Sequence, residues 1–389
     1  NTNDNTPGNT KGKKRLEDAL RSTDIAQPSI GAISLSMLNV LQSFGIRHDA
    51  VCGHSFGELT ALCCAGRINV ETFYSLSTSR GRFMAATGGA QGSMLAVKAP
   101  LDEIDNIIEE NNIDVILANR NSYEQGILSG SKDAVSEAEK ICRQKGFRTT
   151  PLPVAAAFHS RLVEDAAKPF KKFLKSIDII SSDIPVLSNT TGKPYPDDQD
   201  ETKKILGNQF LKPVDFVSEI ENLYETGVHT FVEIGPKTVL TGLVKSILKG
   251  RDFTAVAMDG SAGRRFGISD LAKVLCNLAS LGYGVEIDRW EETPPEPEKQ
   301  NMSIPISGAN YWLPPKPKPK KGPQPVIESK PETEKTYTQK ILKSNYSNKP
   351  VIDKTRLMSD ETKIKDDYIS NALNVVHESI RSMQALQKQ

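Results

Sequence analysis

Ser55 is the residue of this sequence best suited to covalent chemistry. It stands in the stretch VCGHSFGELT (residues 51–60), with glycines at positions 53 and 57. This GxSxG spacing is typical of a serine nucleophile held on a sharp turn between a strand and a helix, where the first amides of the helix face a developing oxyanion. Because glycine is common, the same spacing also fits an ordinary glycine-bounded helix cap.

A serine nucleophile needs a base, and five histidines could supply one. His54 is disfavoured because adjacent side chains on a strand and turn point apart, and His377 falls in a predicted terminal helix. His48 and His229 each precede a predicted strand. By elimination the best candidate is His159, in AAAFHS (155–160), although a core or loop histidine without a catalytic role fits that pattern too.

The elements around Ser55 are predicted to form a strand, a turn and a helix. A short apolar strand is expected over Asp49–Cys52 and a helix over Glu58–Ala65. Before them, apolar residues at helical spacing predict a helix over Pro28–Phe44, with the proline in its first turn.

A compact insertion is predicted between residues 93 and 155. Its elements are expected in the order strand, helix, strand, strand, helix, strand, which is the βαββαβ order of a ferredoxin-like subdomain. The ranges are Ser93–Val97, Leu101–Asn111, Val115–Ala118, Gly126–Ser129, Lys132–Lys145 and Phe147–Val154.

The remaining globular sequence, 16–92 and 156–290, predicts an α/β body of alternating helices and apolar strands, among them Ile184–Leu187 and Thr230–Ile234. Residues 1–15 are polar and predicted to be disordered. After a short segment (291–312), residues 313–359 are rich in proline and lysine and predict an extended linker. Residues 360–389 predict an amphipathic helix, which is either a docking or coiled-coil helix or half of a truncated domain.

Composition indicates an ordinary soluble protein of the cytoplasm. The net charge of +1 gives no electrostatic reason to expect nucleic acid or a membrane surface as a partner. Five cysteines without a CxxC pair argue against a disulfide framework and a zinc site. The sequence has no signal peptide and lacks an initiator methionine, so we interpret it as a fragment of a longer multidomain protein.

Five ordered motifs carry a family resemblance: GHSFGE (53–58), SRGRFM (79–84), AFHS (157–160), NQFLKPVDF (208–216) and EIGPKTVLTGL (233–243). In this order and spacing the sequence resembles the acyltransferase domain of type I polyketide and fatty acid synthases, which is akin to malonyl-CoA:acyl-carrier-protein transacylases. The wording GHSFGELTAL, with GANY (308–311) and SMQALQ (382–387), looks most like synthases of the polyunsaturated fatty acid and heterocyst-glycolipid type.

The resemblance implies a role for six residues. Ser55 would be the nucleophile and His159 its base, without a carboxylate, and the backbone carbonyl of Gln209 would orient the histidine. The backbone N–H of Phe56 would serve the oxyanion, and Arg80 would bind the free carboxylate of the acyl group. Phe158 would favour malonyl over methylmalonyl groups by crowding the extra methyl.

The resemblance also implies the fold, the substrate and the partners. The body would be a parallel-sheet, hydrolase-like (patatin-like) α/β domain. Malonyl-CoA would be the substrate, and an acyl carrier protein would supply the phosphopantetheine thiol, so that no metal or bound cofactor is needed. A ketosynthase and other domains of the same synthase would be further partners.

Three departures from the family pattern affect the site. Ala156 stands where malonyl-type members often have a histidine, and Phe56 is unusual within GHSxGE. No GQGxQ loop, which supplies the second oxyanion donor in the family, precedes Ser55. We therefore expect a segment upstream in the parent protein, and a fragment without it to lose activity.

Other readings of the same residues stay open. A patatin-like lipid hydrolase would pair Ser55 with Asp259 of the downstream Asp-Gly pair, and would need no histidine. An esterase of the α/β-hydrolase type would use Asp105 or Asp114. A non-catalytic scaffold segment of a synthase would use only the linker and the terminal helix.

Overall fold

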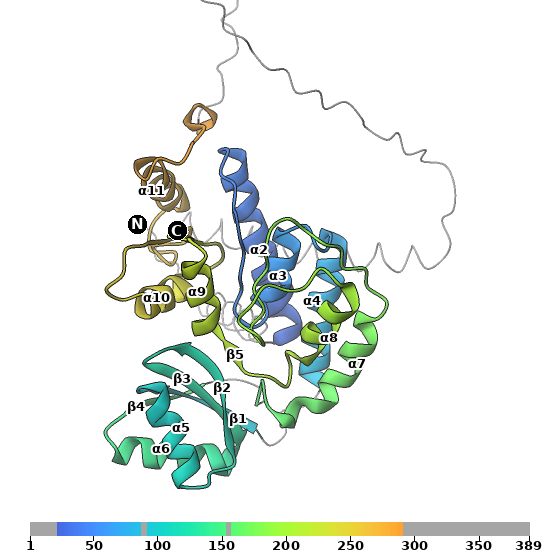
Figure 1. Cartoon of the computed structure of the whole chain (residues 1–389), viewed down its shortest axis with the longest axis vertical. Helices are drawn as coiled ribbons and strands as arrows, with labels where there is room; N and C mark the ends of the chain where they lie inside the picture. Colours follow the sequence, from blue (N-terminus) through green and yellow to red (C-terminus); the bar gives the residue numbers. More distant parts are fainter. Residues whose placement is uncertain (1–21, 87–91, 153–156, 291–389) are drawn as a thin grey trace, which may run out of the picture. The chain divides into compact units, whose positions relative to one another are not determined.

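The structure is a computed structural model that describes residues 22–86, 92–152 and 157–290, all of which belong to one compact unit (Figure 1). The segments predicted at 1–15, 291–312, 313–359 and 360–389 lie outside the described residues. Within the described part, no helix combines the length and the apolar character that crossing a membrane requires.

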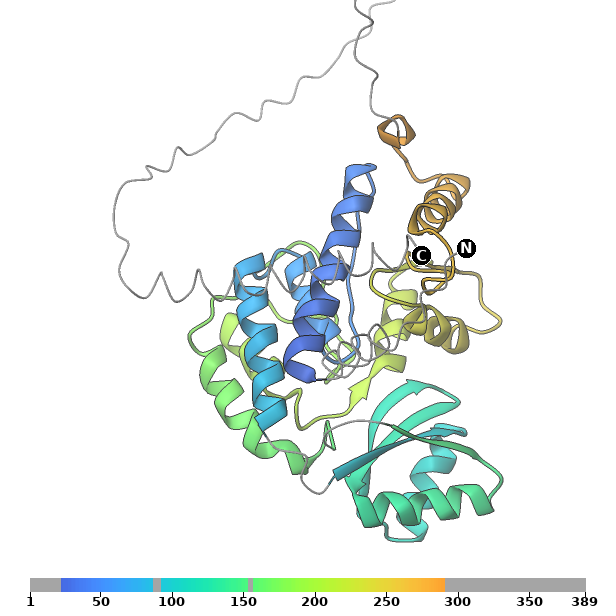
Figure 2. The same ribbon diagram turned by 180° about the vertical axis from the view of Figure 1, so that it is seen from behind.

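The first helices pack closely because glycine allows their backbones to approach. Helix α2 begins at Thr23, earlier than predicted, so Pro28 lies inside the helix and removes one of its backbone hydrogen bonds. A side chain at Gly31 would overlap the ring of Phe73, and one at Gly81 would overlap the start of α2. Figure 2 shows α2 and α4 side by side. The helices are α2 (Thr23–Ser43), α3 (Gly57–Cys64) and α4 (Val70–Ala86).

The insertion has the predicted order of six elements. Its strands form an antiparallel sheet in the order β4-β1-β3-β2, and Figure 1 shows α5 and α6 on one face of that sheet. Alternate residues of β1 are buried on opposite faces, because side chains on a strand alternate. The elements are β1 (Gly92–Lys98), α5 (Leu101–Glu110), β2 (Val115–Ser122), β3 (Gln125–Ser131), α6 (Lys132–Gln144) and β4 (Arg148–Leu152).

A fifth strand joins this sheet from the body. Strand β5 (Val214–Asp215) pairs in parallel with β2 at Asn119 and Arg120, which makes the sheet mixed. One apolar cluster then includes residues from both parts of the chain. From the insertion it takes Leu95, Ile104, Leu128 and Cys142, and from the body Phe216, Ile220, Leu243 and Ile247.

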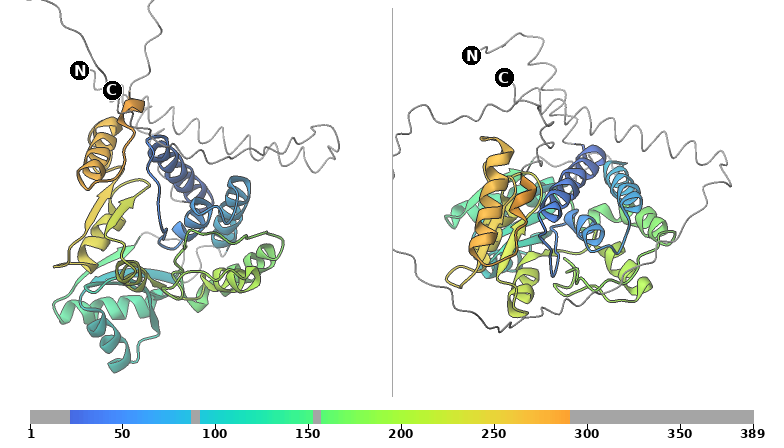
Figure 3. Two further views of the ribbon diagram at one scale, coloured as in Figure 1. Left: turned by 45° about the horizontal axis from the view of Figure 1, so that its top comes forward. Right: turned by 90° about the horizontal axis from the view of Figure 1, so that it is seen from above.

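The predicted parallel sheet of the body is present only in part among the described residues. Their largest sheet is the mixed one, and a separate two-stranded parallel sheet, drawn in yellow in Figure 3, consists of β6 (Thr230–Glu233) and β7 (Thr254–Ala257). The predicted strands at 49–52 and 184–187 are reduced to one parallel bridge between Val51 and Val186. The ladder cannot extend because Pro185 has no N–H and the chain turns at Gly53.

The remaining helices complete two further apolar clusters. One joins α3 and α4 to α7 and α8 around Leu62, Phe73, Phe170 and Leu206. The other joins α2 to α11 around Leu41 and Leu278. The elements are η1 (Arg161–Val163), α7 (Glu164–Leu174), α8 (Gln199–Asn208), α9 (Phe216–Glu225), α10 (Val239–Ile247), α11 (Gly267–Ser280) and η2 (Ile287–Trp290).

Candidate active site

Ser55 lies on a tight turn directly before α3. Its φ of 52° is in the left-handed region, which costs a non-glycine residue about 1–3 kcal/mol and is found mainly where the surroundings enforce it. A side chain at Gly53 would overlap the backbone of Gly57, so the turn requires the first glycine of the motif. A side chain at Gly57 would meet nothing within 4 Å.

His159 is the histidine that the fold brings to Ser55. Its Nε2 lies 2.9 Å from Ser55 Oγ, and its ring is 4% exposed. Nδ1 donates to the carbonyl of Gln209 at 2.9 Å, as predicted, and also faces the carbonyl of Lys212 at 3.1 Å, which was not predicted. Two acceptors at Nδ1 fix the tautomer that leaves Nε2 free to accept the serine proton. His159 also has a left-handed backbone, with φ of 56°.

Electrostatics keep His159 neutral. Burial is the largest cause and the charge of Arg80 the second, and together they lower the pKa of His159 to about 4. At neutral pH the imidazole is therefore unprotonated and can accept a proton.

Arg80 lies in α4 and is 1% exposed, with its guanidinium directed at the site. Nη2 donates to Ser55 Oγ at 3.3 Å and to the Gln209 side chain at 3.0 Å, while Nη1 donates to Gln27 Oε1 at 2.9 Å. Burial lowers the pKa of Arg80 to about 10, so it stays charged at neutral pH. The site thus joins a serine, a neutral histidine and a buried cation.

The sequence of this chain matches the family model described as acyl transferase domain over residues 5–265. The chain belongs to that family. Among curated relatives, the malonyl CoA-acyl carrier protein transacylase of Bacillus subtilis is 35% identical over 237 residues, 59% of this chain and 74% of that protein. One polypeptide of the polyunsaturated fatty acid synthase of Thraustochytrium is 30% identical over 300 residues, 74% of this chain but only 10% of that polypeptide.

Solved structures agree with the match. The malonyl CoA-acyl carrier protein transacylase of Clostridium perfringens superimposes with a TM-score of 0.63 at 34% identity, covering 68% of this chain and 82% of that one. The structure of a type II polyketide synthase acyl-carrier protein in complex with its malonyl-transacylase gives a TM-score of 0.60 at 30% sequence identity. The alignment covers 66% of this chain and 80% of that one. This acyl transferase domain therefore has the α/β fold of those enzymes.

Glu58 organises the polar interior of the acyl transferase domain, and sequence reasoning gave it no role. Its carboxylate accepts hydrogen bonds from Tyr195 Oη at 2.7 Å, from the backbone N–H of Asn189 at 2.8 Å and from the Gln209 side chain. Burial raises the pKa of Glu58 to about 6, opposed by these bonds and by Arg80. The glutamate that directly follows GHSFG was the available signal.

Two amide side chains near Ser55 were also missed. Gln27 Oε1 accepts a hydrogen bond from Arg80. In the sequence Gln27 directly precedes the helix predicted to begin at Pro28, and that position gave little indication of a role in the site. Asn189 accepts from the backbone N–H of Ser55 at 2.5 Å, and no spacing in the sequence connects the two.

The other predicted residues fall into two groups. Phe56 and Phe158 are the sequence neighbours of Ser55 and His159. The Phe56 ring packs on Phe73, and Phe158 packs on the insertion sheet at Met94 and Ile127. The rival aspartates are engaged elsewhere. Asp105 pairs with Arg120, Asp114 with Arg161, and Asp259 accepts from the backbone amides of Lys237 and Gly263.

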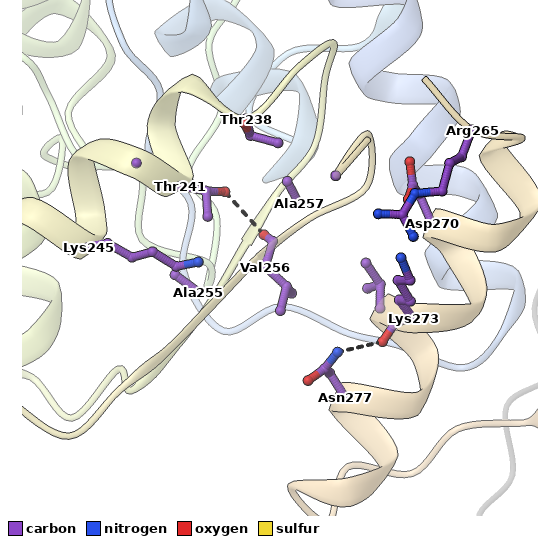
Figure 4. A pocket seen from close by; sticks show the side chains of 13 residues that line it. Thr238, Thr241, Lys245, Ala255, Val256, Ala257, Arg265, Asp270, Lys273 and Asn277 are labelled. Atoms are coloured by element: carbon purple, nitrogen blue, oxygen red, sulfur yellow. Dashed lines mark hydrogen bonds between the residues drawn. The ribbon is translucent and has the colours of Figure 1, made fainter. Parts of the chain in front are cut away.

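A hollow of about 390 Å³ lies between α10, β7 and α11, and Figure 4 shows Lys245 and Thr241 on one side of β7 with Lys273 and Asn277 on the other. Its lining contains none of the predicted site residues. Within residues 22–86, 92–152 and 157–290 no group of three or more His, Cys, Asp or Glu side chains is arranged to hold a metal ion.

Proposed function

We propose that this chain transfers malonyl groups from malonyl-CoA to the phosphopantetheine thiol of an acyl carrier protein, through a malonyl ester on Ser55. The observation that carries the proposal is the position of one oxygen atom. Ser55 Oγ lies 2.9 Å from His159 Nε2 and 3.3 Å from Arg80 Nη2, and this geometry supports His159 as the base and Arg80 as the cation beside a nucleophilic serine.

In the first half-reaction His159 Nε2 takes the Ser55 hydroxyl proton while Oγ attacks the thioester carbonyl. The backbone N–H of Phe56 has no hydrogen-bond acceptor among the described residues, so it is free to stabilise the oxyanion. When the tetrahedral intermediate collapses, the C–S bond breaks and His159 returns the proton to the sulfur of CoA.

Arg80 would hold the malonyl carboxylate. Most of its N–H groups already bind Ser55, Gln209 and Gln27, so the substrate would have to replace at least the contact to Ser55. A guanidinium binds a carboxylate through two parallel hydrogen bonds, and burial strengthens that pairing. Phe158 would add selectivity for malonyl over methylmalonyl, at about 1–3 kcal/mol for a single methyl.

In the second half-reaction the phosphopantetheine thiol gives its proton to His159 and attacks the malonyl ester, and the proton then returns to Ser55. The relative solved in complex with its carrier protein supports a carrier protein as partner. The match covers only 10% of the Thraustochytrium synthase polypeptide. This supports a place for the domain within a cytoplasmic synthase for polyketides or fatty acids, beside other domains such as a ketosynthase. All proton transfers are assigned to His159, so the proposed reaction uses no bound cofactor.

The finer description of the fold is also part of the proposal. The insertion has the element order of a ferredoxin-like subdomain, and its strand order β4-β1-β3-β2 supports that assignment. A parallel bridge at Val51, a turn with a strained serine and a helix support a hydrolase-like, patatin-like body.

Intact-protein mass spectrometry after brief exposure to malonyl-CoA, methylmalonyl-CoA or acetyl-CoA tests the proposal. We expect a malonyl adduct on the wild-type chain, or on a longer chain with an upstream GQGxQ loop where acylation requires that loop, with weaker adducts from the other donors and none after Ser55→Ala. His159→Ala should acylate about 10²- to 10⁴-fold more slowly. Arg80→Ala should lose about 10²-fold or more with malonyl-CoA and much less with acetyl-CoA.

Asp259→Ala is the matched control. Among the described residues its side chain accepts from two loop amides and contacts none of the proposed site residues, so malonyl transfer should be unchanged. Loss of acylation in Asp259→Ala with retention in His159→Ala would favour the lipid hydrolase. If neither this chain nor a longer one that begins upstream with a GQGxQ loop takes up an acyl group from any donor, the scaffold is favoured.

A further inference from the structure

Asn189 is a buried asparagine that hydrogen-bonds both ends of the turn carrying Ser55. Its Oδ1 accepts from the backbone N–H of Ser55 at 2.5 Å, and its Nδ2 donates to the carbonyl of Gly53 at 2.6 Å. The residue is fully buried, and its own N–H donates to Glu58 at 2.8 Å. One side chain therefore closes a ring of hydrogen bonds around His54 and the left-handed residue next to it.

The orientation of this amide matters for the turn. If the Asn189 amide rotated by half a turn, its NH₂ group would face the N–H of Ser55, and two donors cannot bond to each other. A second acceptor for Nδ2 therefore stabilises the productive orientation. Glu219 supplies it, because its Oε1 lies 2.8 Å from Asn189 Nδ2.

Glu219 has the surroundings of a neutral acid. It lies in the first turn of α9 and is fully buried, and its second oxygen, Oε2, has no hydrogen-bond partner among the described residues. Glu58, on the other side of Asn189, disfavours a second negative charge. A buried carboxylate with an unpaired oxygen is costly when ionised, whereas a protonated one still accepts through Oε1.

We infer that Asn189 and Glu219 are a positioning pair for the nucleophile: Glu219 fixes the orientation of the Asn189 amide, and Asn189 holds Ser55 in the conformation that presents Oγ to His159. The effect on catalysis rests on the proposed acyl transfer, but the hydrogen-bonded geometry does not. A nucleophile displaced by about 1 Å can lose about 10²-fold in rate.

Hydrogen exchange at the Ser55 amide tests the geometry without any activity. We expect Asn189→Ala to speed this exchange at least about tenfold and Glu219→Leu to speed it less, because local opening controls exchange. Glu219→Gln should restore the wild-type rate, since it keeps the neutral acceptor. Asn222→Ala, on the same helix and bonded to the carbonyl of Gly192, is the matched control and should change nothing.

The rate of Ser55 acylation by malonyl-CoA, with thermal unfolding in parallel, tests the consequence. Asn189→Ala should acylate about 10²-fold more slowly at similar KM, and Glu219→Leu about tenfold, with rescue by Glu219→Gln. If Asn189→Ala does not fold, the inference is tested by comparing the exchange and acylation rates of Glu219→Leu with those of Glu219→Gln. Wild-type exchange and acylation in Glu219→Leu would overturn the inference. If neither this chain nor a longer one with an upstream GQGxQ loop is acylated, the proposed function is refuted, while the exchange rates still test the positioning pair.

Discussion

At the scale of single residues, the proposed nucleophile has a strained backbone and the proposed base has a lowered pKa. Both Ser55 and His159 have left-handed backbones, which the surrounding hydrogen bonds must maintain. The base is weak because burial and Arg80 both oppose a positive charge on the imidazole. In the proposed mechanism, a substrate carboxylate would compensate the charge of Arg80 and so make His159 a stronger base for Ser55.

The pH dependence of acylation follows from the effect of Arg80 on the pKa of His159. Only neutral His159 accepts a proton, so kcat/KM with malonyl-CoA should stay level on acidification and fall only as the pH drops through about 4. Once a bound carboxylate neutralises Arg80, the pKa of His159 rises, and the acid limb at saturating malonyl-CoA should lie at higher pH. Rapid-quench kinetics across pH would measure both limbs.

Acetyl-CoA provides the control for that prediction. It has no carboxylate to compensate Arg80, so its acid limb should stay near pH 4 even at saturation. An acid limb of kcat/KM at the ordinary histidine pKa of about 6.5 would contradict the effect of Arg80 and burial on His159.

The lowered pKa of His159 also makes folding stability fall on acidification. Between about pH 4 and 6.5 the histidine is protonated in the unfolded chain but neutral in the folded one, so stability is lost as the pH falls through that window. Glu58, raised to about 6, contributes the opposite trend between about pH 4.5 and 6.

Single residues were predicted where the motifs that carry the family resemblance contain them. The roles of Ser55 and His159 remain predictions, but their proximity was anticipated from that resemblance, after elimination alone had left His159 a candidate. Asn189 and Glu219 could not be predicted, because their contacts join segments far apart in the chain: Asn189 is 134 residues from Ser55. Nothing in the local sequence around Glu219 distinguishes a buried glutamate from an exposed one on an amphipathic helix.

At the scale of elements, the turn between Gly53 and α3 constrains its two glycines differently. Gly53→Ala should lose about 3 kcal/mol or more of stability, together with Ser55 acylation, because the new methyl overlaps the backbone of Gly57. Gly57→Ala should be at least as stable as wild type, since it meets open space and alanine favours a helix by about 1 kcal/mol. Thermal unfolding of the two variants checks this, and equal losses at both positions would contradict it.

Element prediction succeeded in the insertion and for the helix after Ser55, predicted over Glu58–Ala65 and observed over Gly57–Cys64, but it failed for the strand before Ser55. Helices α5 and α6 alternate apolar and polar residues at clear helical spacing, so their ranges were predicted within a residue or two. The strands at 49–52 and 184–187 failed because a strand needs a partner with free N–H groups, and Pro185 removes one. Strand β5 has only two residues, too few for any pattern to show.

At the scale of the whole described unit, insertion and body share both a sheet and an apolar cluster. We therefore expect one cooperative thermal transition rather than two. Val214→Lys, at a fully buried position of β5, should lower the unfolding temperature of both parts together, with a loss of about 3 kcal/mol or more. Calorimetry with hydrogen exchange in residues 92–152 would measure this, and a separate early transition of the insertion would contradict it.

The pairing of strand β5 with β2 also determines which segments must be replaced together in a chimera. A chimera that replaces residues 92–152 with the insertion of a relative would keep the host Val214–Asp215 against a foreign β2. That junction lies just after Gln209 and Lys212, whose carbonyls hold His159. A graft of the insertion should therefore carry two separate pieces of sequence, residues 92–152 and the segment from about 209 to 216, so that β2 keeps its own partner strand beside the carbonyls that bind His159.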